Sequence, residues 1–319
     1  MNNIFTAGIV GATGYTGQEL VRLIRAHPRM ELAFASSEAE AGRSVAGNGL
    51  KYVRSADAPL GSVDVVFSCL PTGESGAWAV RAAEAGALSI DLSADLREGQ
   101  HEAVYALPEL WRDGVRGARL VANPGCYPTG ILLGLAPLLA AGVVDGGRPV
   151  IVDAASGVTG AGRSAKRELL FGEVSEDYRA YGVGNVHRHV PEIAAGLSRL
   201  ASRGPDFVFT PHLLPIRRGI LETMYVPVQD GIDAAAVAQL CRDAYAAEPF
   251  VEVMEELPSL KDAVGRNVVA LGASDVHGVQ QPLVVLVAAF DNLLKGAAGQ
   301  ALQNANLLLG LPEAEGLPL

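Results

Sequence analysis

Cys126 is the residue in this sequence best placed to act as a nucleophile. It stands in the segment 122–130 (ANPGCYPTG), between an expected strand and an apolar helix expected to reach about residue 140. Pro128 falls in the first turn of that helix, where its missing N–H has no intrahelical bond to lose. The positive end of a helix dipole and the free N–H groups there stabilise a thiolate. The segment therefore predicts that Cys126 is nucleophilic.

Acid–base groups stand in the segment 185–192 (NVHRHVPE), which brings two imidazoles, a guanidinium and a carboxylate together. Either His187 or His189 can serve a thiol nucleophile as base or acid. The two histidines and Cys126 could also be read as three zinc ligands, but no second cysteine stands at the spacing of a zinc site. We therefore expect no metal and an acid–base role for one histidine.

A dinucleotide-binding loop is predicted at residues 11–17 (GATGYTG), which follow the first expected strand and open a helix. A strand, a glycine-rich turn and a helix in this order let the backbone approach a pyrophosphate at the positive end of the helix. The loop residues expected to contact the cofactor are Gly11, Thr13, Gly14, Tyr15, Thr16 and Gly17.

The choice between NADP and NAD depends on the end of the second expected strand. Ser36 and Ser37 stand there, with Arg43 a few residues on. Hydroxyls and a guanidinium suit the 2′-phosphate of NADP. Glu38 follows directly and could instead hold the ribose hydroxyls of NAD. We expect NADP(H), bound through Ser36, Ser37 and Arg43.

Short apolar runs alternate with helical periodicity in the first part of the chain. Helices are expected at residues 16–27 and 75–85, and strands at residues 5–10, 31–36, 63–70, 88–92 and 119–123. This rhythm is typical of βαβ units. It predicts an α/β protein with a Rossmann-type doubly wound parallel sheet.

Longer strands are expected beyond residue 125, and they predict a second, α+β domain with a mixed sheet. A helix is expected at residues 234–247, and the strands are expected at residues 150–154, 206–211, 220–228, 268–272 and 283–290. A last helix at 296–310 can pack back on the first domain. We therefore expect residues 1–125 and 296–319 to bind NADP, and residues 126–295 to form the catalytic, substrate-binding and oligomerisation domain.

Charge and cysteine content narrow the class of protein. A formal net charge of −10 and a sequence pI of about 5.1 disfavour nucleic acid as a partner. The chain has three cysteines, Cys69, Cys126 and Cys241, and their odd number and wide spacing fit a reducing compartment. Two of them, Cys69 and Cys241, lie in apolar segments and are expected to be buried core residues. No signal peptide and no membrane-spanning stretch are evident. We expect a cytoplasmic protein.

Six sequence blocks resemble, in the same order, those of the N-acetyl-γ-glutamyl-phosphate reductase family, which is related to aspartate-semialdehyde dehydrogenase. The blocks are GATGYTG at 11–17, DLSADLR at 91–97, NPGCYPT at 123–129, SGVTGAGR at 156–163, HRHVPE at 187–192 and NLLKGAAGQ at 292–300. By this resemblance Cys126 is the nucleophile, His187 is the general base or acid, and Tyr181 and Glu192 orient His187. The resemblance also implies that the nicotinamide end of the cofactor is approached by Asn292, Lys295 and Gly296.

Substrate contacts are expected from groups that recognise phosphate and carboxylate. Guanidinium groups match both anions in bidentate geometry. The candidates are Asn123, Arg163, Arg188 and His189, with Arg217 or Arg218 as further arginines.

The activity implied by the resemblance is NADPH-dependent reduction of N-acetyl-γ-glutamyl phosphate to N-acetylglutamate 5-semialdehyde in arginine biosynthesis, by a homodimer or homotetramer. Three other functions remain open. One is a lysine-biosynthesis reductase whose aminoadipate acyl phosphate is attached to a carrier protein, and another is aspartate-semialdehyde dehydrogenase. The third is a non-catalytic NADP-sensing protein, which would need the glycine-rich loop but not Cys126 with its histidines.

Overall fold

The computed structural model describes residues 3–47, 49–201 and 204–319. They form two compact units. The first unit comprises Met1–Gly125 and Ala297–Pro318, and the second comprises Cys126–Gly296 with Leu319. The chain therefore leaves the first unit at the glycine before Cys126 and returns to it just after Gly296.

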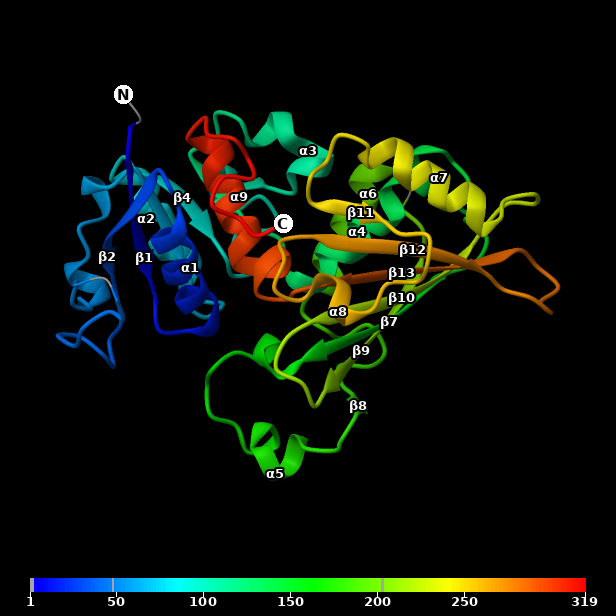
Figure 1. The fold of residues 1–319 in the computed structure, drawn as a ribbon, viewed down its shortest axis with the longest axis horizontal. Helices are drawn as coiled ribbons and strands as arrows, with labels where there is room; N and C mark the ends of the chain where they lie inside the picture. Colours follow the sequence, from blue (N-terminus) through cyan, green and yellow to red (C-terminus); the bar gives the residue numbers. More distant parts are fainter. Residues whose placement is uncertain (1–2, 48, 202–203) are drawn as a thin grey trace. The chain divides into compact units, whose positions relative to one another are not determined.

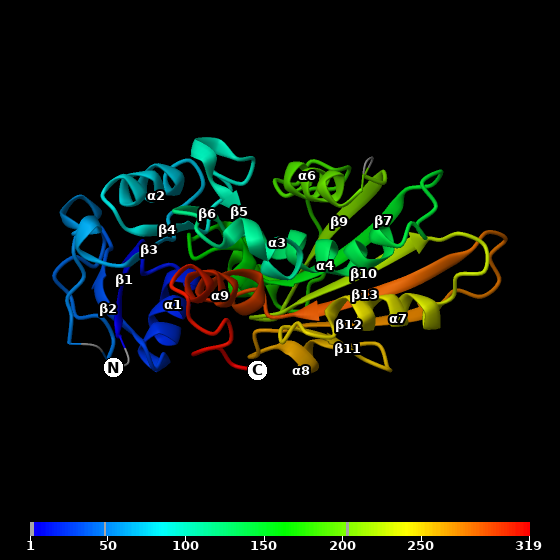
Figure 2. The same cartoon turned by 90° about the horizontal axis from the view of Figure 1, so that it is seen from above.

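A six-stranded parallel sheet forms the centre of the first unit (Figure 1). Its strand order is β2-β1-β3-β4-β6-β5, and every neighbouring pair is parallel. The helix α2 lies on one side of this sheet, while α1 and α9 lie on the other (Figure 2). The strands are β1 (Phe5–Val10), β2 (Met30–Ala35), β3 (Val65–Ser68), β4 (Leu88–Asp91), β5 (Val104–Tyr105) and β6 (Leu120–Ala122), and the helices are α1 (Tyr15–Ala26), α2 (Ser75–Glu84), α3 (Pro108–Val115) and α9 (Gly299–Leu308). The predicted doubly wound Rossmann-type sheet is confirmed.

A seven-stranded mixed sheet forms the second unit, as predicted. Its order is β11-β12-β13-β10-β7-β9-β8, with antiparallel pairs in its middle and parallel pairs between β7 and β9 and between β11 and β12. The strands are β7 (Val150–Gly157), β8 (Arg179–Ala180), β9 (Phe207–Leu214), β10 (Ile220–Pro227), β11 (Val251–Val253), β12 (Val269–Asp275) and β13 (Leu283–Phe290), and the helices are α4 (Cys126–Ala140), α5 (Phe171–Val174), α6 (Val190–Leu200), α7 (Ala234–Tyr245) and α8 (Leu260–Ala263).

The helix α4 is the central helix of the second unit. It packs against β10 and β13 and is flanked by α6 and α7, so almost all of its side chains are buried. A helix that is apolar on every side is expected in such an enclosed position. Neither α4 nor any other helix in the described part of the chain is long and apolar enough to cross a membrane.

The last predicted helix, 296–310, differs from the structure at its start. A π-helical turn spans Leu294–Ala298, and α9 begins only at Gly299. Asp291 causes this turn in part, because its carboxylate accepts hydrogen bonds from the N–H groups of Leu293 and Leu294 and its carbonyl accepts one from Gly296. Such single π turns often occur at functional sites.

A buried glutamate lies beneath the first turns of α4. Glu222 on β10 is fully buried between Ala154 and Ala288 of the neighbouring strands. Neither of its carboxyl oxygens has a hydrogen-bond partner among the residues described, and burial raises its pKa well above the usual range. The carboxyl therefore favours its neutral form. It is accommodated because Gly130 presents no side chain there: a Cβ on Gly130 would lie 2.2 Å from Glu222 Oε2.

Gly130→Ala should lower the free energy of unfolding by about 1–3 kcal/mol, the usual cost of overpacking a full core. The new methyl group would meet Phe290 at 2.5 Å as well as Glu222. Gly172→Ala in α5 is the matched control, because a Cβ there meets nothing within 4 Å, and it should change stability by less than about 0.5 kcal/mol. Denaturant unfolding measures both, and equal stability of the two variants would contradict the packing described.

Candidate active site

Cys126 is the first residue of α4 and is half-buried. The backbone of the π-helical turn approaches it closely, since a Cβ on Gly296 would lie 3.1 Å from Cys126 Cβ. Gly296 therefore leaves room for the cysteine side chain. The position at the start of a helix was predicted, and α4 has the predicted bounds.

A cavity of about 360 Å³ opens beside Cys126 in the second unit. Its walls come from the start of α4, the end of β7, the segment 160–169, the segment 179–189 and β9. The lining residues are Cys126, Tyr127, Ser156, Gly157, Gly160, Ala161, Lys166, Glu168, Leu169, Arg179, Tyr181, His187, Arg188, His189 and Leu213. Five residues singled out from the sequence, Cys126, Tyr181, His187, Arg188 and His189, thus lie around one cavity.

His187 is enclosed by rings. Tyr127, Tyr181, His189 and Phe209 each meet it edge-on, with ring centroids 4.8–5.6 Å away. Burial, together with the positive charge of Arg188, lowers the pKa of His187 to about 4. The backbone N–H of His189 donates a hydrogen bond of 3.1 Å to His187 Nδ1.

Three hydroxyl groups lie along the same wall. The hydroxyls of Tyr127 and Tyr181 lie 2.9 Å apart, and the Ser156 hydroxyl donates to the carbonyl of Gly157. Burial raises the pKa of Tyr181 to about 12 and that of Tyr127 further. Both phenols therefore stay protonated at neutral pH.

Two of these residues, Tyr127 and Ser156, were not singled out from the sequence. Tyr127 directly follows Cys126, and Ser156 opens the SGVTGAGR block. These positions, within two motifs already identified, are the sequence feature that could have indicated both residues. Phe209 on β9 also packs against His187. No motif near Phe209 in the sequence indicates this contact.

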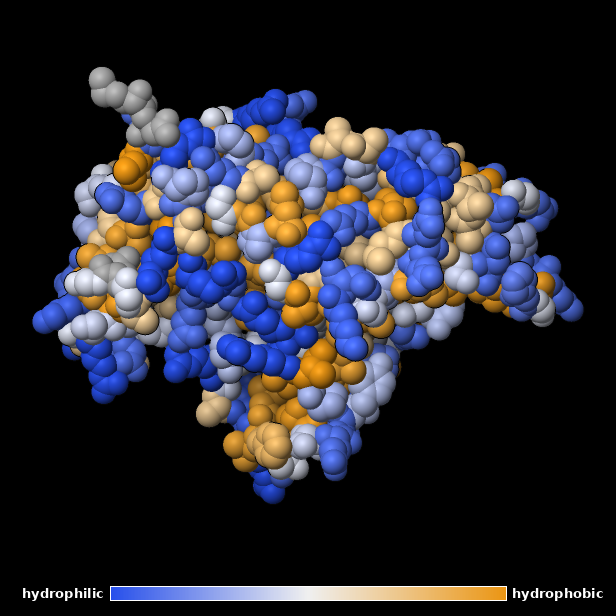
Figure 3. Space-filling model, in the orientation of Figure 1, coloured by the Kyte–Doolittle hydropathy of each residue, from blue (hydrophilic) through white to orange (hydrophobic). Residues whose placement is uncertain are grey.

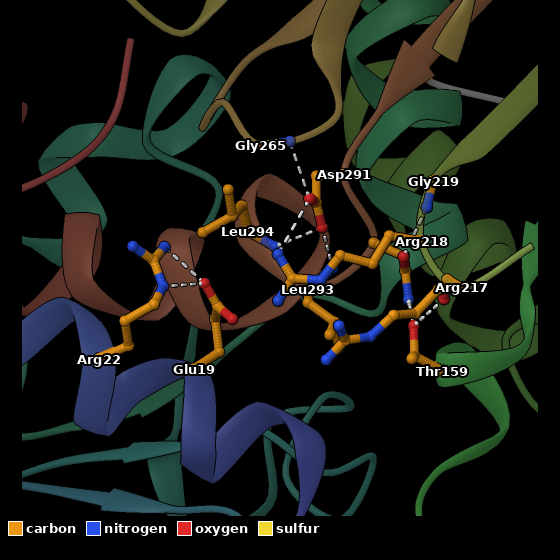
Figure 4. Close-up of polar contacts among 11 residues, drawn as sticks. Glu19, Arg22, Thr159, Arg217, Arg218, Gly219, Gly265, Asp291, Leu293 and Leu294 are labelled. Carbon is orange, nitrogen blue, oxygen red and sulfur yellow. Dashed lines mark hydrogen bonds and ion pairs between the residues drawn. The ribbon is translucent and has the colours of Figure 1, made fainter. Parts of the chain in front are cut away.

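The loop after β7 is held in place by the Asn292 side chain, from the turn after β13, and by the backbone of the segment between β9 and β10. Thr159 donates its hydroxyl to the carbonyl of Arg217, and Asn292 donates to Thr159 Oγ1 while its own oxygen accepts from Gly219 N–H. Figure 4 shows Thr159 beside Arg217. Asn292, predicted to contact the cofactor, thus uses its amide to fix this loop.

Asp291 forms a second fixed point next to that loop (Figure 4). It is fully buried, and its carboxylate accepts from Leu293, Leu294 and Gly265 N–H groups and from the Arg218 guanidinium at 3.3 Å. Arg218, one of the candidate substrate arginines, is therefore engaged with Asp291.

In the first unit, Glu19 and Arg22 of α1 form an ion pair with an N–O distance of 2.6 Å. Figure 4 also draws this pair.

The other residues predicted for the substrate lie in different places. Arg163 and Arg217 are exposed and are not among the lining residues. Asn123 is buried in the first unit, where its amide donates to the carbonyl of Ala297 and its oxygen accepts from Asn304. These two contacts give Asn123 a structural role within its unit.

Two further cations line the cavity, and neither was predicted. Lys166 is exposed, and Arg179 donates to the carbonyls of Glu168 and Glu173 and pairs with Asp177. Arg179 therefore holds the loop that carries Lys166 and Glu168, rather than being free to bind a ligand.

Glu192 and Lys295 are both buried in the second unit. Glu192 stands in the first turn of α6, just after Pro191. The Lys295 ammonium lies 5.3 Å from the ring centroid of Phe250. Of the π-helical turn, the Gly296 backbone lies next to Cys126. Among the described residues, no group of three or more His, Cys, Asp or Glu side chains could hold a metal ion.

In the first unit, the three glycines of the 11–17 loop have three different surroundings. Gly11 has a φ of +81°, which side chains rarely adopt, and a Cβ on Gly17 would lie 2.7 Å from the backbone of Ala12. Gly14 has an ordinary φ of −66° and caps α1 without a side-chain hydrogen bond. A Cβ on Gly14 would meet nothing nearer than 3.8 Å. The fold thus requires Gly11 and Gly17, whereas Gly14 leaves open space at the N-terminus of α1.

The serines after β2 have different environments. Ser36 is fully buried, and its hydroxyl accepts from Gly11 N–H and lies 3.0 Å from that of Ser55. Ser37 lies 3.1 Å from the hydroxyl of Thr13. Glu38 accepts from Ser55 N–H, and the hydrogen bonds from Ser55 lower its pKa.

Arg43 is exposed and pairs with Glu40 at 2.8 Å. Its guanidinium is thus on the surface of the same loop as Ser37. Near the end of β2 the structure thus has the hydroxyls of Thr13 and Ser37 and the long cationic side chain of Arg43, while the Glu38 carboxylate is bound to the Ser55 backbone.

Comparisons with known proteins agree with this geometry. Residues 6–118 match the family model of the semialdehyde dehydrogenase NAD-binding domain, and residues 126–292 match that of the semialdehyde dehydrogenase dimerisation domain. An N-acetyl-γ-glutamyl-phosphate reductase of Symbiobacterium thermophilum is 45% identical, covering 97% of this chain and 96% of its own. One of Azotobacter vinelandii is also 45% identical, covering 97% of each chain. The solved structure of aspartate semialdehyde dehydrogenase II from Vibrio cholerae has a TM-score of 0.79 at 22% identity, covering 97% of this chain and 99% of that one.

Proposed function

Because the chain belongs to the N-acetyl-γ-glutamyl-phosphate reductase family of semialdehyde dehydrogenases, we propose that it reduces N-acetyl-γ-glutamyl phosphate with NADPH. The products are N-acetylglutamate 5-semialdehyde and phosphate, and the reaction belongs to arginine biosynthesis. The observation that carries the proposal is the placement of Cys126 at the head of α4, on one cavity with His187.

Cys126 acts as the nucleophile in this proposal. Its thiolate attacks the acyl carbon, the C–S bond forms, and phosphate leaves with the electrons of the C–O bond. A thioester accepts a hydride more readily than an oxygen ester does, which explains why cysteine rather than serine suits this position. His187 serves the acyl oxygen, with Tyr127 and Tyr181 packed against its ring.

The cofactor is held, in this proposal, by the loop 11–17 and the residues after β2. When bound, NADPH supplies the hydride. Gly14 lets the backbone approach the pyrophosphate, and the N–H groups at the start of α1 bind it. The open space beside Gly14 and the uncapped start of α1 fit this role.

We assign the 2′-phosphate of NADP to Thr13, Ser37 and Arg43. Glu38 would repel a phosphate if its carboxylate faced the site, but that carboxylate is bound to Ser55 N–H. Ser36 supports the loop through Gly11 and is left out of the direct contacts. This arrangement favours NADP over NAD.

For the substrate we propose two cationic contacts in the cavity. Arg188 and Lys166 line it and can bind the phosphate and the α-carboxylate. Arg163 is not among the residues that line the cavity, so we assign it no direct contact with the substrate.

We also propose that the protein works as a homo-oligomer in the cytoplasm. Ile151 and Val208 are paired across β7 and β9 and are about 40% exposed, and Leu170 and Phe171 at the start of α5 are 56% and 86% exposed. Figure 3 shows apolar surface on the part of the second unit that carries α5. Three free cysteines fit a reducing compartment. Light scattering gives the mass of the assembly and distinguishes a dimer from a tetramer.

The experiment that tests the proposed function follows the reverse reaction. N-acetylglutamate 5-semialdehyde, phosphate and NADP should give NADPH, and omission of phosphate should abolish it. Aspartate semialdehyde and the aminoadipate semialdehyde analogue, with NADP or NAD, are the comparison substrates. A higher kcat/KM with either of them would overturn the assignment, and silence with all of them would favour a carrier-bound substrate or a sensor.

A further inference from the structure

We infer that Asn304 of α9 is a positioning residue for Cys126, and that it acts through the side chain of Asn123 and the carbonyl group of Ala297. These groups belong to the backbone segments that precede and follow the surroundings of the cysteine. The inference rests on the proposed function for its meaning in catalysis, but the reactivity of Cys126 can be measured without any substrate.

Asn123 is engaged through its backbone and its side chain alike. Its N–H donates to the carbonyl of Asp91 at 2.8 Å, and its carbonyl accepts from Arg97 Nε at 2.9 Å. Its Nδ2 donates to the carbonyl of Ala297 at 3.2 Å, and its Oδ1 accepts from Asn304 Nδ2 at 3.0 Å. Asn123 is buried, so water does not readily replace a partner that is lost.

The bond between Asn123 and Ala297 joins two segments that flank the nucleophile. Asn123 follows β6 and leads through Pro124 and Gly125 into Cys126. Ala297 directly follows Gly296, and a Cβ on Gly296 would lie 3.1 Å from Cys126 Cβ. One side-chain hydrogen bond therefore ties the segment that leads into the cysteine to the segment that packs against it.

Backbone carbonyls determine which way the buried amides point. A carbonyl oxygen only accepts, so the Asn304 atom that lies 3.1 Å from the Ala106 oxygen must be the amide nitrogen. The same NH₂ group donates to Asn123 Oδ1, and Gln300 donates to Asn304 Oδ1 at 3.3 Å. Asn123 must then present its own NH₂ group to Ala297. Asn304 thus fixes the orientation of the Asn123 amide.

Loss of the Asn304 side chain would leave Asn123 Oδ1 buried without its donor. An unsatisfied buried acceptor is costly, and rotation of the Asn123 amide relieves that cost only by breaking the bond to Ala297. The segment before Cys126 and the π-helical turn are then free to move apart. The thiol would move away from the start of α4, where the helix dipole and free N–H groups stabilise its thiolate.

Asn306 provides the matched control, because it is a second fully buried asparagine on α9. Its Nδ2 donates to the carbonyls of Glu313 and Glu315, and its Oδ1 lies 3.1 Å from His27 Nε2. These contacts hold the C-terminal segment against the end of α1. Asn306→Ala therefore removes buried amide hydrogen bonds from the same helix without touching the bonds of Asn123.

The test compares Asn304→Ala and Asn306→Ala in the full-length protein without substrate. The rate of iodoacetamide modification at Cys126, followed by mass spectrometry, is measured across a range of pH. We expect Asn304→Ala to raise the midpoint of this pH profile by about 0.5–1 pH unit, and Asn306→Ala to change it by less than about 0.2. Both variants should lower the thermal unfolding midpoint. An Asn304→Ala midpoint equal to that of the wild type would overturn the inference.

Asn304→Ser is the milder variant, because it keeps a hydroxyl in the same space. It should raise the midpoint in the same direction, and it decides the question if Asn304→Ala does not fold.

A double variant tests the route from Asn304 to the cysteine. If Asn304 acts through Asn123, the variant with both residues changed to alanine should have the same midpoint as Asn123→Ala alone. Additive changes would show that Asn304 does not act through Asn123, and would overturn the inference.

Kinetics separate the inference from the proposed function. Asn304→Ala should lower kcat by about 10- to 100-fold, as expected when a reacting group is displaced by about 1 Å, and leave the KM for NADPH within about threefold. An unchanged kcat would overturn the role of Asn304 in catalysis. If the wild type turns over none of the substrates, the proposed function fails, while the modification profiles still decide whether Asn304 positions Cys126.

Discussion

Cys126→Ser should lower kcat for phosphate-dependent aldehyde oxidation by at least about 10⁴-fold, the scale on which loss of a covalent nucleophile acts. A serine hydroxyl has almost the same size as the thiol but is hardly ionised near neutral pH, so it cannot form the acyl-enzyme at a useful rate. Gly296 leaves room for the cysteine side chain, and the serine side chain, which is no larger, fits the same space. Steady-state kinetics and a thermal unfolding curve for the same sample measure both consequences.

Cys241→Ala is the matched control for this variant. Cys241 is fully buried on α7, and burial raises the pKa of its thiol to about 12. Burial raises the pKa of the Cys69 thiol as well. Iodoacetamide should therefore modify Cys126 first and inactivate the protein in step with one label. Activity of Cys126→Ser within about tenfold of wild type would remove Cys126 from the mechanism.

Sequence periodicity predicted the long, well-buried elements with accurate bounds. The expected strands 5–10 and 283–290 are β1 and β13, and the expected helix after Cys126 is α4. The two-residue strands β5 and β8 were missed, because a period cannot be recognised over so few residues. Their pairing is decided by the neighbouring strands.

The helix α6 was missed for a different reason. It starts at Val190, inside the segment 185–192 whose residues were expected to do chemistry. Pro191 stands in its first turn and is a helix-start signal that predicts such a helix. The π-helical turn at Leu294–Ala298 could not be predicted, because it depends on the buried Asp291 receiving several backbone N–H groups.

The candidate site was predictable where chemistry and local structure coincide. Cys126, His187 and Arg188 lie around one cavity, as their motifs suggested. Lys166 reaches the cavity on a long loop, and no local pattern indicates that. The roles of Arg163 and Lys295 stay predictions. Arg163 is exposed, and the Lys295 ammonium lies 5.3 Å from the ring centroid of Phe250.

Roles that depend on a single hydrogen bond were out of reach of the sequence. The hydrogen bond that His187 Nδ1 accepts comes from the backbone N–H of His189, and the buried Ser36 hydroxyl supports the loop by accepting from Gly11 N–H. Residue type restricts what a side chain can do, whereas packing decides which of those possibilities is used.

Gly14→Val should raise the KM for NADPH by about 10- to 100-fold while leaving the fold intact. Gly14 has a φ of −66° and open space where a side chain would stand, so the protein by itself has little need of glycine there. A valine would occupy the space in which the pyrophosphate meets the N–H groups of α1. Losing a charge-assisted hydrogen bond is worth about 1.5–3 kcal/mol, which corresponds to that range of affinity.

Gly17→Ala provides the contrast, because its Cβ would lie 2.7 Å from the Ala12 backbone and must disturb the packing of α1 on β1. It should lower the free energy of unfolding by about 1–3 kcal/mol, whereas Gly14→Val should lose at most about 1 kcal/mol, as expected for a less favourable helix cap. NADPH titration by fluorescence and denaturant unfolding separate the two effects. If Gly14→Val binds NADPH as the wild type does, the phosphates are not held at the start of α1, and the cofactor assignment for this loop is wrong.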